Sequence, residues 1–153
     1  MTSLDMTIAN AAVDIGRATA EFDGFASRHD LPAPVKRRVG VALDEILSNI
    51  MNYAYNDRSD HSIGVNVLLE EERLTITVID DGMPFNPFDR ESPDVDQRIE
   101  ERSSGGLGIY LVSQMMDNVS WERRGDRNVV VMHTRTDRLD DELNGTLDSK
   151  ETQ

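Results

Sequence analysis

Residues 39–56 read VGVALDEILSNIMNYAYN. In a helix, the apolar side chains of this stretch fall three and four residues apart on one face, which is the spacing of a buried stripe. These side chains are Val39, Leu43, Ile46, Leu47, Ile50 and Ala54. A second stripe with the same spacing is polar and consists of Glu45, Asn49, Asn52 and Asn56. We expect the rest of the domain to be arranged around this central helix.

The polar stripe has an unusual composition, because no Lys or Arg occurs anywhere from Val39 to Asn56. The ordinary interpretation is a solvated face, but such faces are usually furnished with Lys, Glu and Arg. Each asparagine costs a helix interior roughly 0.5 kcal/mol relative to alanine. The stripe therefore favours a site over a plain surface, with one carboxylate as a general base beside an amide that binds a metal.

Composition narrows the class of protein. The 153 residues suffice for one domain with its own core. The net charge of −13 disfavours a nucleic acid or an anionic membrane as partner, because nothing would neutralise the partner's phosphates. The chain has no cysteine, shows no signal peptide and has no apolar run long enough to span a bilayer. We expect a cytoplasmic domain.

Hydrophobic periodicity predicts the order strand, helix, helix, hairpin, lid, helix, hairpin. The predicted strands are 4–8, 63–69, 74–78, 119–123 and 129–133; the helices are 11–28 with Asn10 as N-cap, about 35 to 56, and 109 onward; the lid is 86–104. Five strands in antiparallel pairs, with three helices covering one face, make an α+β two-layer sandwich. We expect residues 1–136 to form this domain, followed by an acidic, disordered tail over 137–153.

Glu45 and Asn49 lie four residues apart, so their side chains leave the helix in the same direction. An amide oxygen suits Mg²⁺, which binds few protein groups besides waters and phosphates. A carboxylate one turn away can deprotonate a hydroxyl that attacks a phosphoryl group. The pattern Glu-x-x-x-Asn is common in helices and by itself identifies nothing.

Two glycine-containing segments follow further along the chain. Asp80-Asp81-Gly82 ends a predicted strand, where a carboxylate can accept a hydrogen bond from an exocyclic amine, although the segment alone favours a β-turn. Gly105-Gly106-Leu107-Gly108 opens a helix, and exposed backbone N–H groups there attract phosphate. In isolation a hinge is an equally good interpretation of those glycines. The ordinary P-loop pattern GxxxxGK[ST] is absent.

Taken together and in this order, the segments resemble the ATP-binding fold shared by gyrase, Hsp90, histidine kinases and MutL. Residues 45–49 match the N box of that superfamily, residues 80–82 its adenine-binding box, and residues 105–108 its second glycine box. The resemblance extends from about Leu4 to Arg135. It implies the Bergerat fold, with a mixed, mainly antiparallel sheet.

Within that superfamily the chain is most similar to the anti-sigma-factor serine/threonine kinases of the RsbW type. The likeness rests on LDEILSNIMNYAY at 43–55, DDGMPFNPFD at 80–89 and GGLGIYLVSQMMDNVSWER at 105–123. It implies a homodimer that binds ATP with Mg²⁺ and sequesters a sigma factor. In exchange, such a protein binds an antagonist with a STAS domain, an anti-anti-sigma factor, and phosphorylates it on serine or threonine.

The resemblance also implies roles for particular residues. Glu45 is the general base, Asn49 binds Mg²⁺ and with it the nucleotide, and Asp80 reads the adenine amino group. Gly82 lies against the adenine base. The phosphate-lining segment consists of Gly105, Gly106, Leu107 and Gly108.

Other polar residues inherit no role from the resemblance. Tyr53 stands where many relatives have histidine, and side chains vary at the position of Asn52. Arg98 and Arg102 lie in the lid and could reach a γ-phosphate, but a solvated charged loop is the better interpretation for each. Arg17 lies near the polar edge of the first helix, where a contact with a partner and a plain surface charge are equally good interpretations. Met115, Met116 and Trp121 are most simply core residues.

Two alternatives to a serine kinase deserve weighing. His29-Asp30-Leu31 faintly resembles the phosphoacceptor box of histidine kinases, but Pro32 and Pro34 would break the helix that such a box needs. A binding module that holds ATP and a sigma factor without phosphoryl transfer is the second alternative. The presence of both Glu45 and Asn49 argues against it.

Overall fold

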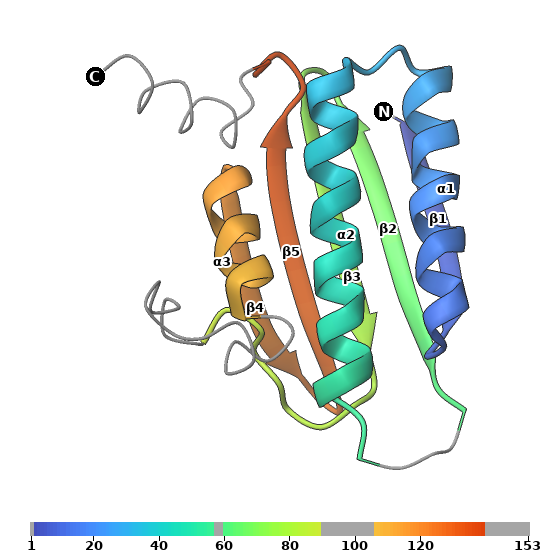
Figure 1. Ribbon diagram of the computed structural model, residues 1–153, viewed down its shortest axis with the longest axis vertical. Helices are drawn as coiled ribbons and strands as arrows, with labels where there is room; N and C mark the ends of the chain where they lie inside the picture. Colours follow the sequence, from blue (N-terminus) through green and yellow to red (C-terminus); the bar gives the residue numbers. More distant parts are fainter. Residues whose placement is uncertain (1, 57–59, 90–105, 140–153) are drawn as a thin grey trace.

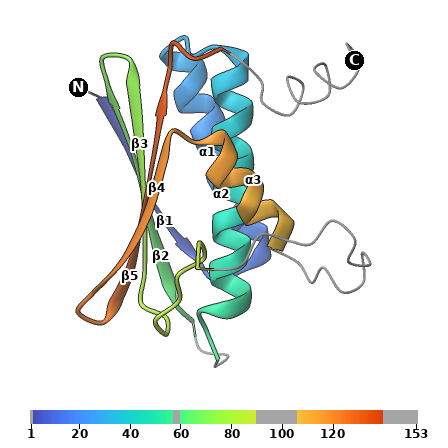
Figure 2. The ribbon, with the colours of Figure 1, turned by 90° about the vertical axis from the view of Figure 1, so that its left-hand side faces the viewer.

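The computed structural model describes residues 2–56, 60–89 and 106–139. It shows one antiparallel sheet of five strands with three helices packed on a single face, so the predicted α+β two-layer sandwich is confirmed (Figures 1 and 2). The strands are β1 (Thr2–Ala9), β2 (Ser62–Glu70), β3 (Arg73–Asp80), β4 (Asn118–Arg124) and β5 (Arg127–Arg135). The helices are α1 (Ala12–Arg28), α2 (Ala33–Tyr53) and α3 (Gly106–Met115).

The strand order is β1-β2-β3-β5-β4, so the last strand of the chain inserts between β3 and β4. The four strand pairs described are all antiparallel, without the parallel pair that a mixed sheet would add. In the register of β3 against β5, Asp80 pairs with Asn128 and Ile76 with Met132. This crossover brings the last hairpin beside the end of β3.

The centre of the core is α2, as the apolar stripe predicts. Its residues from Val39 to Ala54 that form the stripe are at most 1% exposed, and they pack on inward-facing residues of β2 and β3 such as Val67 and Ile76. The helix starts at Ala33, earlier than predicted, because Pro34 in the first turn needs no hydrogen-bond donor. It ends at Tyr53, so Asn56 lies beyond it.

The start of α1 differs from the prediction. Ala11 occupies the N-cap position, and no side chain caps the helix. The predicted cap, Asn10, instead accepts a hydrogen bond through Oδ1 from the backbone N–H of His61, with 3.2 Å between the two atoms. The N-cap prediction is wrong because a contact with a distant loop competes for the same side chain.

None of the helices in the described ranges combines the length and the apolar character that crossing a membrane requires.

Candidate active site

Glu45 and Asn49 occupy adjacent turns of α2, and the carboxylate of Glu45 lies beside the first turn of α3. Asn49 is only 1% exposed, whereas Asn52, one turn further on, is exposed. The polar stripe predicted from the sequence is therefore divided between a buried amide and exposed ones. Only Glu45 and Asn49 keep the placement that a site requires.

The two polar ends of the Asn49 side chain have different surroundings. Its Nδ2 donates to the backbone oxygen of Glu45 at 2.7 Å. Its Oδ1 is buried and has no hydrogen-bond partner in the described part of the chain. A buried acceptor without a donor costs about 1–3 kcal/mol, so such an atom calls for an explanation. A cation is a suitable partner, and an amide oxygen is a ligand that Mg²⁺ accepts.

The carboxyl group of Glu45 is partly withdrawn from water. Burial, and to a lesser degree the neighbouring charge of Asp44, raise the pKa of Glu45 above its ordinary value. A raised pKa makes a carboxylate a stronger base at the pH where it is still ionised. The environment of Glu45 therefore suits proton abstraction.

The first turn of α3 lies against Glu45. A Cβ placed on Gly108 would overlap Oε2 and Cδ of the Glu45 side chain, so only glycine leaves the carboxylate its position. Gly106 and Leu107 belong to the same first turn, at the end of the helix where backbone N–H groups are unpaired. Gly105, like Arg98 and Arg102 of the predicted lid, lies outside the described residues.

Asp80 ends β3 and is 2% exposed. Its Oδ1 accepts hydrogen bonds from the backbone N–H of Gly82 and from Nδ2 of Asn128, both at 2.9 Å. Burial raises the pKa of Asp80, and these two donors oppose that rise by favouring the ionised form. The carboxyl group is thus fixed in place at the end of a rigid strand.

Gly82 is held directly against the end of α2. A Cβ at this position would come within 2.5 Å of the backbone oxygen of Ala54 and 2.7 Å of its Cβ. The next N–H, that of Met83, donates to the same Ala54 oxygen at 2.7 Å. The Asp-Gly segment therefore forms a turn, as its sequence alone predicts. This turn packs against the end of the helix that carries Glu45 and Asn49.

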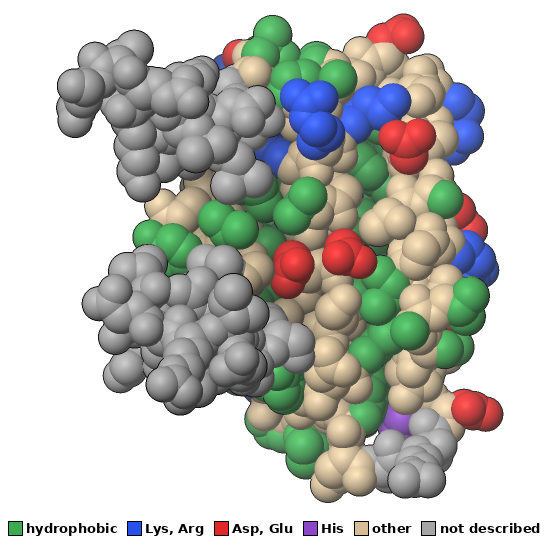
Figure 3. All heavy atoms as spheres, viewed as in Figure 1, with side chains coloured by type: hydrophobic (Ala, Val, Ile, Leu, Met, Phe, Trp, Pro, Cys, Tyr) green, Lys and Arg blue, Asp and Glu red, His purple; other side chains and the backbone are tan. Residues whose placement is uncertain are grey.

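The predicted segments meet α2 at two places, one in its second half and one at Ala54, directly after its last residue; we call Glu45, Asn49 and Ala54 together the α2 strip. Gly108 contacts the strip at Glu45 and Gly82 contacts it at Ala54. Nine residues of helix separate these two contacts, which is about 14 Å along the axis. On the helical face of the molecule, acidic side chains lie near the middle over α2 and basic ones gather at the end where α1 and α2 are joined (Figure 3).

The last hairpin contributes residues that sequence reasoning missed. Asn128 of β5 is 1% exposed and bonds Asp80, and Arg123 of β4 donates through Nη1 to the backbone oxygen of Gly82 at 2.7 Å. Trp121, predicted as core, is partly buried against the core and also donates to Asn128. The only signal in the sequence was an asparagine directly before the apolar run Val129 to Met132.

The remaining polar candidates lie in other surroundings. Arg17 donates to the backbone oxygen of Thr7 and pairs with Asp14 on the surface, and the Tyr53 ring contacts the Phe85 ring with 5.7 Å between centroids. Met115 and Met116 are buried in the core, as expected.

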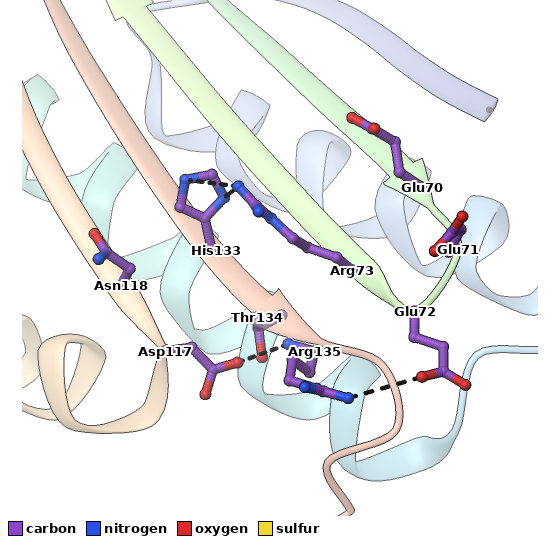
Figure 4. Close-up of a pocket in the computed structure, with 9 residues that line it drawn as sticks. All are labelled: Glu70, Glu71, Glu72, Arg73, Asp117, Asn118, His133, Thr134 and Arg135. Carbon is purple, nitrogen blue, oxygen red and sulfur yellow. Dashed lines mark hydrogen bonds and ion pairs between the residues drawn. The ribbon is translucent and has the colours of Figure 1, made fainter.

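A cavity of about 1000 Å³ lies at the other end of the sheet, beside the turn between β2 and β3 (Figure 4). Among its charged lining residues, Arg135 pairs with Glu72, and the backbone N–H of Arg135 donates to Oδ2 of Asp117. None of the predicted site residues lines it. The candidate site is therefore the strip on α2 and not this cavity.

Comparison with known proteins identifies the family of the chain. The family described as the histidine kinase-like ATPase domain matches residues 8–134. The chain belongs to the histidine kinase-like ATPase domain family. Its curated relatives carry the name serine-protein kinase RsbW, so the predicted resemblance to that type is confirmed, and with it the expected enzyme class, an ATP-using protein serine/threonine kinase, at the level of the family.

Three of these relatives show the extent of the likeness. The Bacillus velezensis protein is 29% identical over 76% of this chain and 75% of its own length. The Halalkalibacterium halodurans protein is 26% identical over 94% of this chain and 90% of its own length. The Listeria monocytogenes protein is 30% identical over 70% of this chain and 69% of its own length.

Proposed function

We propose that this protein binds ATP along the α2 strip and transfers the γ-phosphoryl group to a serine or threonine of a STAS-domain anti-anti-sigma factor. We further propose that it is a cytoplasmic homodimer that sequesters a sigma factor until the antagonist displaces it. One observation carries the proposal: α2 joins a buried carboxylate at the end of β3 to the glycine turn of α3, with Glu45 and Asn49 between them.

The adenine base of the nucleotide binds at Asp80 and Gly82. Among the described residues no hydrogen bond reaches Oδ2 of Asp80, because both of its donors bond Oδ1. That free oxygen suits an exocyclic amine. Gly82 would lie against the adenine base through its backbone, since the side on which a Cβ would stand faces Ala54.

At the phosphate end, the first turn of α3 offers unpaired N–H groups at Gly106, Leu107 and Gly108, with Gly105 directly before it. Glu45 lies against this turn and takes the proton from the acceptor hydroxyl as that oxygen attacks the γ-phosphorus and ADP leaves. Asn49 would hold Mg²⁺ through its unpaired Oδ1. When bound, the ion neutralises the charge of the phosphates.

The test is phosphoryl transfer from γ-labelled ATP to a purified STAS-domain antagonist. Glu45→Gln should lower the transfer rate about 10²- to 10⁴-fold, because the amide cannot accept the proton, while ATP binding is retained. Glu71→Gln is a matched control, since Glu71 is exposed in the turn between β2 and β3. Transfer by Glu45→Gln at the wild-type rate would remove Glu45 from the mechanism.

The same experiment separates the kinase from a binding module. A wild-type protein that binds ATP and the antagonist but transfers no label is the non-catalytic module. The partner proposals have their own measurements. Co-purification with a sigma factor that is lost when the antagonist is added supports sequestration, and a solution mass of one chain contradicts the dimer.

A further inference from the structure

Asn128 makes four hydrogen bonds from a position that is 1% exposed. Its Nδ2 donates to Oδ1 of Asp80 at 2.9 Å and to the backbone oxygen of Met83 at 2.7 Å. Its Oδ1 accepts from the backbone N–H of Phe85 at 3.0 Å and from Nε1 of Trp121 at 3.1 Å. Both donor hydrogens and both acceptor sites of the amide are in use.

This arrangement admits only one orientation of the amide. Phe85 and Trp121 contribute N–H groups, which can only donate, so the oxygen of Asn128 must face them. The NH₂ group must then face Asp80 and the Met83 carbonyl. If the amide were flipped, its NH₂ group would face two other donors and its oxygen would face two other acceptors. The indole of Trp121 and the backbone of Phe85 therefore fix which end of Asn128 meets the Asp80 carboxylate.

The consequence for Asp80 is an asymmetric carboxylate. Both of its hydrogen bonds, from Gly82 and from Asn128, end on Oδ1. The two donors come from different parts of the chain, one from the turn after β3 and one from β5, and together they fix the rotation of the group. Oδ2 is left as the acceptor on a residue that is only 2% exposed, where a hydrogen bond discriminates strongly between ligands that have a donor and ligands that lack one.

We propose that Asn128 is a positioning residue that directs Oδ2 of Asp80 at the exocyclic amine of the bound base, and so sets the preference of this site for a purine that carries that amine. The inference rests on the proposed function, since it concerns the base end of the same nucleotide site. Asn128 itself bonds Asp80 and the turn and has no hydrogen-bonding group left for the nucleotide.

Asn128 also connects Asp80 to the turn that follows β3. By bonding the Met83 oxygen and the Phe85 N–H, it fixes the backbone of this turn at both ends of Pro84. Arg123 bonds the Gly82 oxygen from the neighbouring strand. The base-reading carboxylate and the backbone beside it are thus held by one hairpin, β4–β5, as a single unit.

The experiment compares the affinity for ATP with the affinity for purine riboside triphosphate, which lacks the amino group. Wild type should prefer ATP by about tenfold or more, as a hydrogen bond to a charged group predicts. In Asn128→Ala the ATP affinity should fall and the preference should shrink to about threefold or less. A residue that only supports the fold would weaken both nucleotides equally and leave their ratio unchanged, which is the result that overturns the proposal.

Two further variants complete the design. Thr134→Val is the matched control, because Thr134 is equally buried on β5 but bonds Arg38 at the other end of the strand; its ratio should equal that of wild type. Asn128→Leu keeps the approximate volume of the side chain and removes the donor to Asp80, so its ratio should shrink as in Asn128→Ala. If Asn128→Ala does not fold, an unchanged ratio in Asn128→Leu overturns the proposal.

The failures of the two proposals are distinguishable. A wild-type protein that binds neither nucleotide contradicts the proposed function. A wild-type protein that prefers ATP, together with an Asn128→Ala variant that keeps the full preference, contradicts only the positioning role of Asn128.

Discussion

Gly108 and the carboxylate of Glu45 are in direct contact, although they come from different helices: a Cβ on Gly108 would overlap Oε2 and would lie 2.9 Å from Oε1. The glycine turn of α3 therefore does more than expose N–H groups to a phosphate. It leaves the space in which the proposed general base lies. The two segments depend on each other for their geometry.

Gly108→Ala is the direct test of this contact. The new methyl group must displace the flexible Glu45 carboxylate, so we expect phosphoryl transfer to fall by about 10²-fold, near the lower end of what general-base catalysis contributes. Gly40→Ala on α2 is the control, because a Cβ there meets nothing within 4 Å. Single-turnover transfer of label measures both variants. A Gly108→Ala enzyme with wild-type turnover would show that Glu45 has no fixed place in the reaction.

Asn49→Ala should abolish the metal-dependent part of nucleotide binding. The unpaired Oδ1 is the one buried side-chain oxygen or nitrogen without a partner in the described ranges, and alanine removes it. A ligand at about 100 times its dissociation constant stabilises a protein by about 2.7 kcal/mol. We expect the extra thermal stabilisation that Mg²⁺ adds to ATP to disappear in this variant. Asn52→Ala, on the exposed turn that follows, should retain it, and an equal loss in both would argue against a specific ligand.

The acid limb of the pH–rate profile should follow Glu45. Its pKa is raised by burial and then by Asp44, and the base acts only when ionised, so activity is lost as the pH falls through this raised pKa. Asp44→Asn removes the second cause and should move the limb to lower pH, while burial keeps it above the value of a free glutamate. Glu71→Gln is the control: it removes an equal charge in the exposed turn between β2 and β3 and should leave the acid limb where it is in wild type. Identical limbs in wild type and Asp44→Asn would contradict the assignment.

Gly82→Ala should destabilise the protein as well as weaken ATP binding. The added Cβ would lie 2.5 Å from a backbone oxygen of α2, which cannot swing aside as a side chain can. Forcing such a group into a packed site costs about 1–3 kcal/mol. Gly64→Ala in β2 meets only one atom, at 3.9 Å, and serves as the control in urea unfolding. Equal stabilities for the two variants would mean that the turn is not fastened to α2.

Arg38 should contribute to the free energy of unfolding at a position remote from the proposed nucleotide site. It is 5% exposed and donates to Oγ1 of Thr134 at 2.8 Å and to the backbone oxygens of Arg135 and Arg138 at 2.9 and 2.7 Å. Hydrogen bonds from a charged donor contribute about 1.5–3 kcal/mol each, and the loss of the buried charge offsets part of that sum.

For Arg38→Ala we expect a net loss of about 2–3 kcal/mol in the free energy of unfolding. Arg37→Ala, on the exposed neighbour, should stay within about 0.5 kcal/mol of wild type. Urea denaturation at constant pH measures both. A stable Arg38→Ala variant would show that the end of β5 needs no tie to α2.

Periodicity and spacing were sufficient for the elements of this fold. The apolar stripe of α2 and the alternation of the strands follow from side-chain directions that are fixed within each element, so these patterns are visible without any tertiary contact. The acid-amide pair, Asp80 with Gly82, and the α3 glycines were likewise local patterns, and their order along the chain indicated a nucleotide site. Element ends moved by a few residues, as with Pro34 inside α2.

Tertiary structure decided the remainder, because it concerns groups that meet across long separations in sequence. Asn10 bonds His61 instead of capping α1, and Asn128 meets Asp80 only because β5 inserts beside β3 in one register. Whether an amide on α2 is buried or exposed depends on what packs around the helix, and this separates Asn49 from Asn52. The sequence alone predicted the chemistry of the proposed site. The packing of β5 and α3 determined which oxygen of Asp80 and which amide of α2 remain free to take part in it, because hydrogen-bond partners are chosen by proximity in space.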